Sequence, residues 1–92
     1  MRILKTQLPV DNDWHELEGV HFPGQIKHIA CQFDVSIVQV WFEEDTNEYV
    51  RTPSNIKGRI YGTGQPIEDI ASWAGTTVVA DGELVWHLAV KV

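Results

Sequence analysis

The sequence predicts an all-β fold, either a small antiparallel β-sandwich or a partly open barrel of about seven short strands with almost no helix. Apolar residues recur with a period of two in several stretches, most clearly over residues 83–92. Residues that favour turns, chiefly glycine, proline, asparagine and aspartate, separate these stretches. Because the chain has 92 residues, we expect one domain spanning 1–92.

The first half of the chain predicts four strands. Residues 2–8 alternate loosely and predict a first strand closed by Pro9, and residues 14–18 predict a short second strand. Residues 26–44 predict a β-hairpin, because apolar residues alternate on both sides of a short polar break at 34–36. Its inward faces are expected to carry Ile29, Cys31 and Phe33 on one strand and Val38, Val40 and Phe42 on the other.

The second half predicts three more strands. Residues 56–61 form the first, and residues 72–80 run into the second, with room for one helical turn at 67–71 between them. Asp81-Gly82 predicts a tight hairpin turn, because type I′ geometry needs positive φ at both positions. The last strand is expected to place Leu84, Trp86, Leu88, Val90 and Val92 on one face.

Composition argues against several classes of function. Seven basic residues stand against 13 acidic residues, and a net charge of −6 opposes binding to nucleic acid. A single cysteine allows no internal disulfide, which favours the reducing cytoplasm. The start of the chain lacks the apolar stretch of a signal peptide, and no segment approaches the roughly 20 apolar residues of a membrane span. We therefore expect a cytoplasmic protein with no membrane partner.

The sequence predicts neither a catalytic centre nor a bound cofactor. Its four histidines lack the close spacing of zinc ligands, so no metal site is expected. The glycines of Gly62-Thr63-Gly64 follow a strand, but the third glycine and the helix of a dinucleotide-binding motif are missing. A structural turn explains them better, and Cys31 is expected to lie in the core. We therefore predict that the protein is not an enzyme.

The four tryptophans are the feature that most favours protein binding. Trp41 and Ile37 fall on the strand face opposite Val38 and Val40, so they either cover a second core layer or stand exposed. Tryptophan is enriched as an anchor in protein interfaces. The predicted protein-binding surface comprises Trp41, Ile37, Tyr61, Arg59 and the loop Gly62, Thr63, Gly64, Gln65 and Pro66. A sandwich that uses all its tryptophans to fill two faces is the structural alternative.

The stretch Arg59-Ile60-Tyr61-Gly62-Thr63-Gly64-Gln65-Pro66-Ile67 resembles a group of small uncharacterised bacteriophage proteins. The resemblance extends to Leu8-Pro9-Val10, Gly75-Thr76 and the closing Leu84-Val85-Trp86-His87. Members of that group usually carry histidine at the position of Gln65. The resemblance implies a phage origin and location in the cytoplasm of a bacterial host, but it implies no reaction.

These observations predict a phage accessory protein, a non-enzymatic module that binds a host or phage protein. One alternative is a self-assembling structural protein whose last strand, which carries few charges, pairs edge to edge with a copy in a homo-oligomer. A second alternative is a small-ligand binder or an enzyme that uses the Gly62–Pro66 loop.

Overall fold

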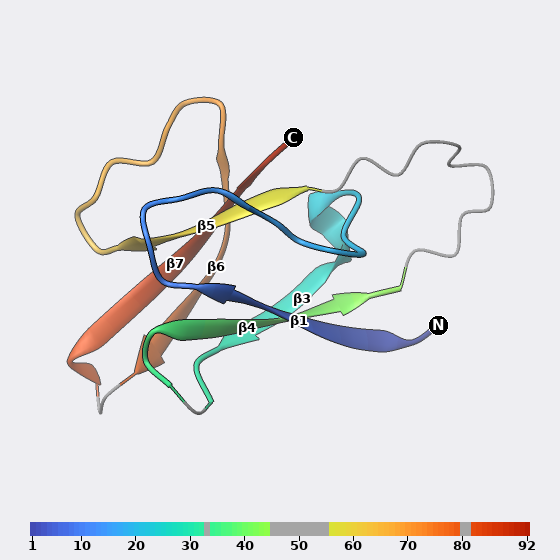
Figure 1. The fold of residues 1–92 in the computed structure, drawn as a ribbon, viewed down its shortest axis with the longest axis horizontal. Coiled ribbons are helices and arrows are strands. Elements are labelled where there is room, and N and C mark those ends of the chain that lie inside the picture. Colours follow the sequence, from blue (N-terminus) through green and yellow to red (C-terminus); the bar gives the residue numbers. More distant parts are fainter. Residues whose placement is uncertain (33, 45–55, 80–81) are drawn as a thin grey trace.

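The computed structural model describes residues 1–32, 34–44, 56–79 and 82–92, which form two packed antiparallel sheets (Figure 1). The three-stranded sheet has the order β1–β4–β3, with β1 at Ile3–Pro9, β4 at Ile37–Glu43 and β3 at Ile26–Ala30. The four-stranded sheet has the order β2–β5–β7–β6, with β2 at His15–Glu16, β5 at Lys57–Gly62, β7 at Leu84–Lys91 and β6 at Ser72–Val79. The prediction of an all-β fold with about seven strands is confirmed.

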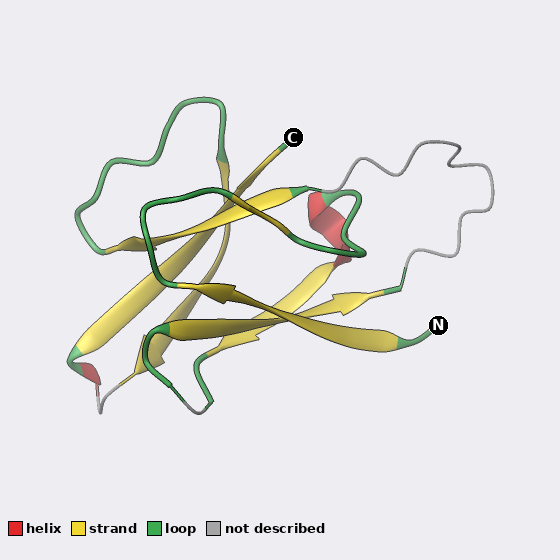
Figure 2. Ribbon diagram, viewed as in Figure 1, coloured by secondary structure: helices red, strands yellow, loops and turns green. Residues whose placement is uncertain are grey.

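Helical structure in the described residues is confined to short turns (Figure 2). The 3₁₀ turn η1 covers Pro23–Gln25, just before β3. The helical turn expected at 67–71 is instead a single reverse turn, in which Ala71 N–H donates to the carbonyl oxygen of Glu68 at 2.9 Å.

The core lies between the two sheets and follows the alternation of the strands. On β4, Val38, Val40 and Phe42 are buried as predicted, and Ile29 is buried opposite them on β3. The four-stranded sheet contributes Ile60, Leu88 and Val90, while Cys31 packs at the margin of the core. Phe33, the third residue predicted on that face, lies outside the described residues. The period-2 pattern thus identified the inward faces, because burial of one face requires it.

The alternative in which the last strand pairs edge to edge with a copy of the chain is wrong. β7 is an interior strand that pairs with β5 on one side and β6 on the other, with Leu88 opposite both Ile60 and Gly75. Its main-chain groups are used in these two ladders, so it offers no free edge to another chain. The edges of this sheet are β2 and β6.

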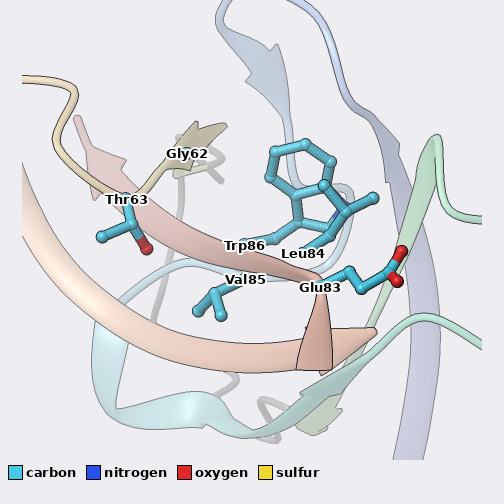
Figure 3. Close-up of a pocket in the computed structure, with 6 residues that line it drawn as sticks. All are labelled: Gly62, Thr63, Glu83, Leu84, Val85 and Trp86. Atoms are coloured by element: carbon cyan, nitrogen blue, oxygen red, sulfur yellow. The ribbon is translucent and has the colours of Figure 1, made fainter. Parts of the chain in front are cut away.

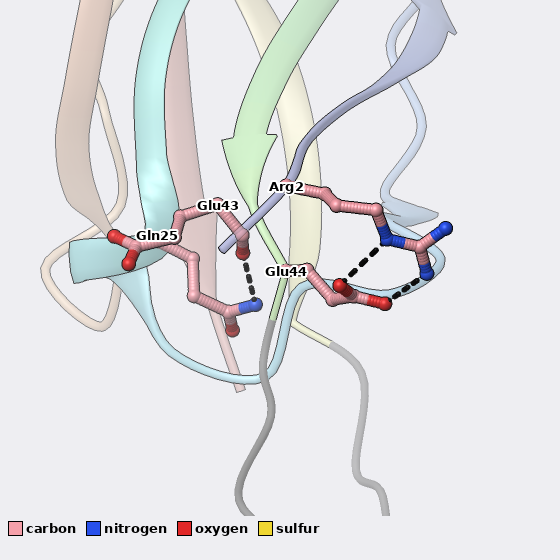
Figure 4. A network of polar contacts seen from close by, with 4 residues as sticks. All are labelled: Arg2, Gln25, Glu43 and Glu44. Atoms are coloured by element: carbon pink, nitrogen blue, oxygen red, sulfur yellow. Dashed lines mark hydrogen bonds and ion pairs between the residues drawn. The ribbon is translucent and has the colours of Figure 1, made fainter.

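A buried glutamine holds the segment before β3 against the end of β4 (Figure 4). Gln25 is 1% exposed, and its Nε2 donates to the carbonyl oxygens of Gly19 and Glu43 at 3.1 and 3.0 Å. Its Oε1 accepts from Phe22 N–H at 3.0 Å. Nearby, Arg2 forms an ion pair with Glu44. A buried amide whose nitrogen and oxygen both form hydrogen bonds stabilises the fold, whereas burial of an amide without partners costs free energy.

The turn predicted at Asp81-Gly82 lies partly beyond the described residues. Gly82 has a φ of 92°, the positive value that a tight turn requires, but Asp81 lies outside the described residues. Residues 34–36 of the β3–β4 turn are described, and there Asp34 Oδ1 accepts from the N–H and the hydroxyl of Ser36 at 2.8 and 2.7 Å. These two bonds lower the pKa of Asp34.

Candidate protein-binding surface

The outer face of the three-stranded sheet presents an aromatic side chain between two nitrogen-bearing side chains. Because Val38 and Val40 point inward, Trp41 points outward from the central strand β4. The register places Lys5 of β1 and His28 of β3 directly on either side of Trp41. Lys5 Nζ lies 5.9 Å from the centroid of the indole ring, and the His28 ring centroid lies 5.6 Å from it. Lys5 and His28 are exposed, while Trp41 is half-buried between them.

The same face is partly closed at its other end. Gln39 also points outward but is 3% exposed, and its Oε1 accepts from Gln32 N–H in the β3–β4 turn at 2.9 Å. Ile37, at the start of β4, is half-buried. We call the exposed and half-buried residues of this outer face, Lys5, His28, Ile37 and Trp41, the Trp41 face.

The outer face of the four-stranded sheet carries a second aromatic group, but other parts of the chain cover it. Tyr61 points outward from β5 and is only 2% exposed. The ring of Trp14 meets it edge-on, with centroids 6.4 Å apart and an interplanar angle of 67°. The guanidinium of Arg59 lies 4.6 Å from the centroid of Tyr61, and Lys91 Nζ lies 4.4 Å from that of Trp14. Two cations thus flank a pair of aromatic rings, an arrangement that stabilises both.

Glu68 joins the members of this covered cluster. Its Oε1 lies 3.6 Å from Arg59 Nη1 and accepts from Trp14 Nε1–H at 3.4 Å. We call the set Trp14, Arg59, Tyr61, Glu68 and Lys91 the Tyr61 face. Glu68 of the same chain thus supplies the carboxylate that pairs with Arg59.

The Tyr61 face contains both a charged margin and unpaired polar atoms. The pKa of Asp11 at its margin is lowered, chiefly by the N–H of Asp13 and then by His15, with a smaller contribution from Arg59. Within the described part of the chain, Tyr61 OH and Arg59 Nε are buried without a hydrogen-bond partner. Tyr61 is therefore closed off from solvent, although two polar atoms of the cluster have no hydrogen-bond partner among the described residues.

The Gly62–Pro66 loop forms a tight turn at the end of β5. Gly62 N–H donates to Gln65 Oε1 at 2.6 Å, and Gln65 N–H donates back to the Gly62 carbonyl oxygen at 3.2 Å. Gly64 has a φ of 91°, which glycine adopts without strain. Residues 63–66 are exposed. Gly64 therefore has the structural role in a turn that the sequence indicated.

An open cavity of about 400 Å³ lies beside this turn, lined by Gly62, Thr63 and residues 83–86 (Figure 3). Thr63 and Trp86 approach it from different sides of β7. Trp86 is half-buried against the core, as the sequence predicted, and its Nε1–H donates to the carbonyl oxygen of Val35 at 2.8 Å.

His87 connects this cavity to β6 through hydroxyl groups. Its Nε2 lies 2.9 Å from Thr63 Oγ1, and its Nδ1 lies 2.9 Å from Thr76 Oγ1. Trp73 Nε1–H donates to that same Thr76 hydroxyl at 3.0 Å. A neutral imidazole donates through one nitrogen and accepts through the other, so one threonine accepts and the other donates. No sequence pattern indicated this cluster, because its members come from three separate segments.

The predicted binding residues do not form one surface. Trp41 and Ile37 lie on the outer face of one sheet, whereas Tyr61, Arg59 and the loop belong to the other sheet. Tyr61 is buried and so cannot contact a partner unless its cover moves. Trp73 and Val78 of β6, which are 63% and 61% exposed, are among the exposed apolar residues outside the predicted surface. The absence of charge from residues 72–79 could have indicated them.

Several other features bear on the class of site. No three His, Cys, Asp or Glu residues among those described gather in a way that could hold a metal ion. Burial raises the pKa of the half-buried Cys31 thiol, which disfavours the reactive thiolate. The described residues form no helix of the length and apolar character needed to cross a membrane.

The fold defines a small all-β domain built from two packed antiparallel sheets. Over residues 1–92 the chain matches the model of a family described as a domain of unknown function (DUF7352), and it belongs to that family. No curated protein and no solved structure matches it.

Proposed function

We propose that this protein is a non-enzymatic module that binds another protein, of a bacterial host or of a phage, through the Trp41 face. The position of Trp41 between Lys5 and His28 on an open sheet face is the observation that carries the proposal. Tryptophan is the residue type most enriched at interface hot spots. Neighbours on both sides restrict the indole, so binding would cost less side-chain entropy than for a free side chain. The resemblance to phage proteins supports the choice of partner and the host cytoplasm as its location.

The charges around Trp41 define the partner more closely. The chain carries a net charge of −6, yet Lys5 adds a positive charge beside the indole. A partner that buries Trp41 also desolvates the Lys5 ammonium, which then needs an acceptor. We therefore expect a partner surface with an apolar pocket for the indole and a carboxylate placed against Lys5.

Capture from a bacterial lysate tests this proposal when matched tryptophan variants are compared. Wild-type protein and the variants Trp41→Ala and Trp73→Ala serve as baits, because Trp73 is 63% exposed on the other sheet. We expect Trp41→Ala to lose a protein that wild type and Trp73→Ala both retain, and Lys5→Glu to weaken the same capture. If Trp41→Ala captures the same proteins in the same amounts as wild type, the Trp41 face is not the contact surface.

The cavity beside Gly62 supports a second candidate function, the binding of a small ligand. It is a concave site with a threonine hydroxyl at its wall and an imidazole behind that hydroxyl. Such a site suits a polar small molecule that exchanges hydrogen bonds with Thr63. A screen of small polar compounds by ligand-observed NMR tests it. Binders whose signals change with wild type but not with Thr63→Val support this function, whereas no binder, or the same binders with both proteins, would exclude Thr63 from it.

A further inference from the structure

The edge strand β6 differs from the other three edges of the two sheets. Exposed edges are normally guarded by charged residues, by proline or by short length. β1 contains Lys5 and Pro9, β3 contains Lys27 and His28, and β2 has only two residues. β6 has eight residues, Ser-Trp-Ala-Gly-Thr-Thr-Val-Val, with neither a charged residue nor a proline. It is the edge that is best suited to pair with another strand.

The side chains of β6 make the outer face of this edge apolar. Trp73 pairs with Ala89 of β7 and Val78 pairs with Val85, so both point to the outer face, where they are 63% and 61% exposed. A register shift between Trp73 and Gly75 brings them to one face although an odd number of positions separates them. Gly75 itself is partly exposed. Because glycine has no side chain, this exposure is that of the main chain.

We propose that the edge of β6 pairs antiparallel with β6 of a second copy of this chain. A two-fold axis at Thr76 sets this residue opposite its own copy and Gly75 opposite Thr77. The register shift between Trp73 and Gly75 skips one residue of β6, so that Trp73 then lies opposite Val78. Gly75 and Thr77 both pair with inward-facing residues of β7, so every pair in this register joins residues of the same face. A slip of one residue would mix the faces. The strand is therefore self-complementary, as an isologous interface requires.

The absence of charge from β6 makes this edge the place where a second, equally acidic copy can approach with little repulsion. The protein carries 13 acidic residues and a net charge of −6, so two copies repel across most of their surface. Pairing through β6 sets no charged side chain of that strand against another, and it covers Trp73 and Val78 of both copies. The pairing joins the two four-stranded sheets into one continuous sheet.

Light scattering of the full chain across a range of concentrations, with two lysine variants, tests the dimer. Val78→Lys places a charge on the proposed interface, and Ile3→Lys places one at a half-exposed position on β1. We expect wild type and Ile3→Lys to show twice the monomer mass and Val78→Lys to be monomeric with an unchanged circular dichroism spectrum. A monomeric wild type, or a dimer that both variants retain or both lose, would overturn the proposal.

Disulfide trapping tests the register with a readout that does not depend on affinity. In a Cys31→Ser background, the double variant Trp73→Cys/Val78→Cys is expected to form a covalent dimer under mild oxidation. A double variant with the cysteines at Ile3 and Trp73 serves as the control and should remain mostly uncrosslinked. Equal crosslinking of the two would contradict the register. Trp41 lies on the other sheet, so Trp41→Ala should remain dimeric, and failure of either proposal leaves the other standing.

Discussion

Both outer faces of the sandwich carry an aromatic residue beside a cation, yet Trp41 is partly exposed whereas Tyr61 is buried. Arg59 lies 4.6 Å from the centroid of Tyr61, and Lys5 lies 5.9 Å from that of Trp41. Tyr61 is nevertheless 2% exposed, because the ring of Trp14, from a distant part of the sequence, meets it edge-on, and Glu68 contacts both Trp14 and Arg59. Whether such a pair stabilises the fold or can contact a partner therefore depends on side chains from other segments that cover it, and not on the alternation of the strand itself.

Truncation of the two aromatic residues should give the largest contrast in stability. Tyr61→Ala empties a closed site and is expected to lower the free energy of unfolding by about 3–5 kcal/mol. Trp41→Ala removes a half-buried surface side chain and should cost about 1 kcal/mol or less. Urea unfolding followed by circular dichroism measures both. Equal losses for the two variants would mean that the faces do not differ as described.

Removal of the Trp14 side chain should expose Tyr61 to solvent. Trp14→Ala deletes the ring that meets Tyr61 edge-on and is expected to cost about 1–3 kcal/mol, from lost apolar burial and the aromatic contact. It should also make Tyr61 reactive to nitration, which mass spectrometry locates. Trp73→Ala, a tryptophan of the same sheet away from Tyr61, is the control. An unreactive Tyr61 in Trp14→Ala would show that Trp14 is not its cover.

The buried hydroxyl of Tyr61 allows a finer test of the closed face. Tyr61→Phe keeps the ring and removes an oxygen that has no hydrogen-bond partner in the described part of the chain. We expect stability to be unchanged or raised by up to about 1 kcal/mol, because the desolvation cost of the hydroxyl disappears. If urea unfolding shows a loss of stability larger than about 1 kcal/mol, the Tyr61 hydroxyl has a stabilising hydrogen-bond partner after all.

The smallest expected effect is a dependence of stability on acid pH at the margin of the Tyr61 face. The folded-state pKa of Asp11 lies below its unfolded value of about 3.9, chiefly because Asp13 N–H donates to the carboxylate. A depressed pKa stabilises the fold above the unfolded value, and this contribution is lost as the pH falls through the folded one. Asp11→Asn should therefore flatten the fall in melting temperature below about pH 4. Trp41→Ala should leave the shape of that curve unchanged.

The sequence predicted the elements of the fold better than their arrangement. Alternation identified the inward residues of β4, because one face of that strand is fully buried. It did not reveal that the last strand is interior, since the order of strands in a sheet depends on pairings between distant segments. The same limit applies to the candidate site. The outward position of Trp41 followed from alternation, but the burial of Tyr61 depends on Trp14, which no periodic pattern places there.

Site-specific photo-crosslinking tests most directly the claim that the Trp41 face is open to a partner and the Tyr61 face is not. A photoreactive amino acid is introduced at Gln7, which is exposed on the outer face of β1, or at Lys57, which is exposed on the outer face of β5. After irradiation in bacterial lysate, we expect a discrete adduct with a second protein from position 7 and none from position 57. The same adduct from both positions, or an adduct from position 57 alone, would contradict it.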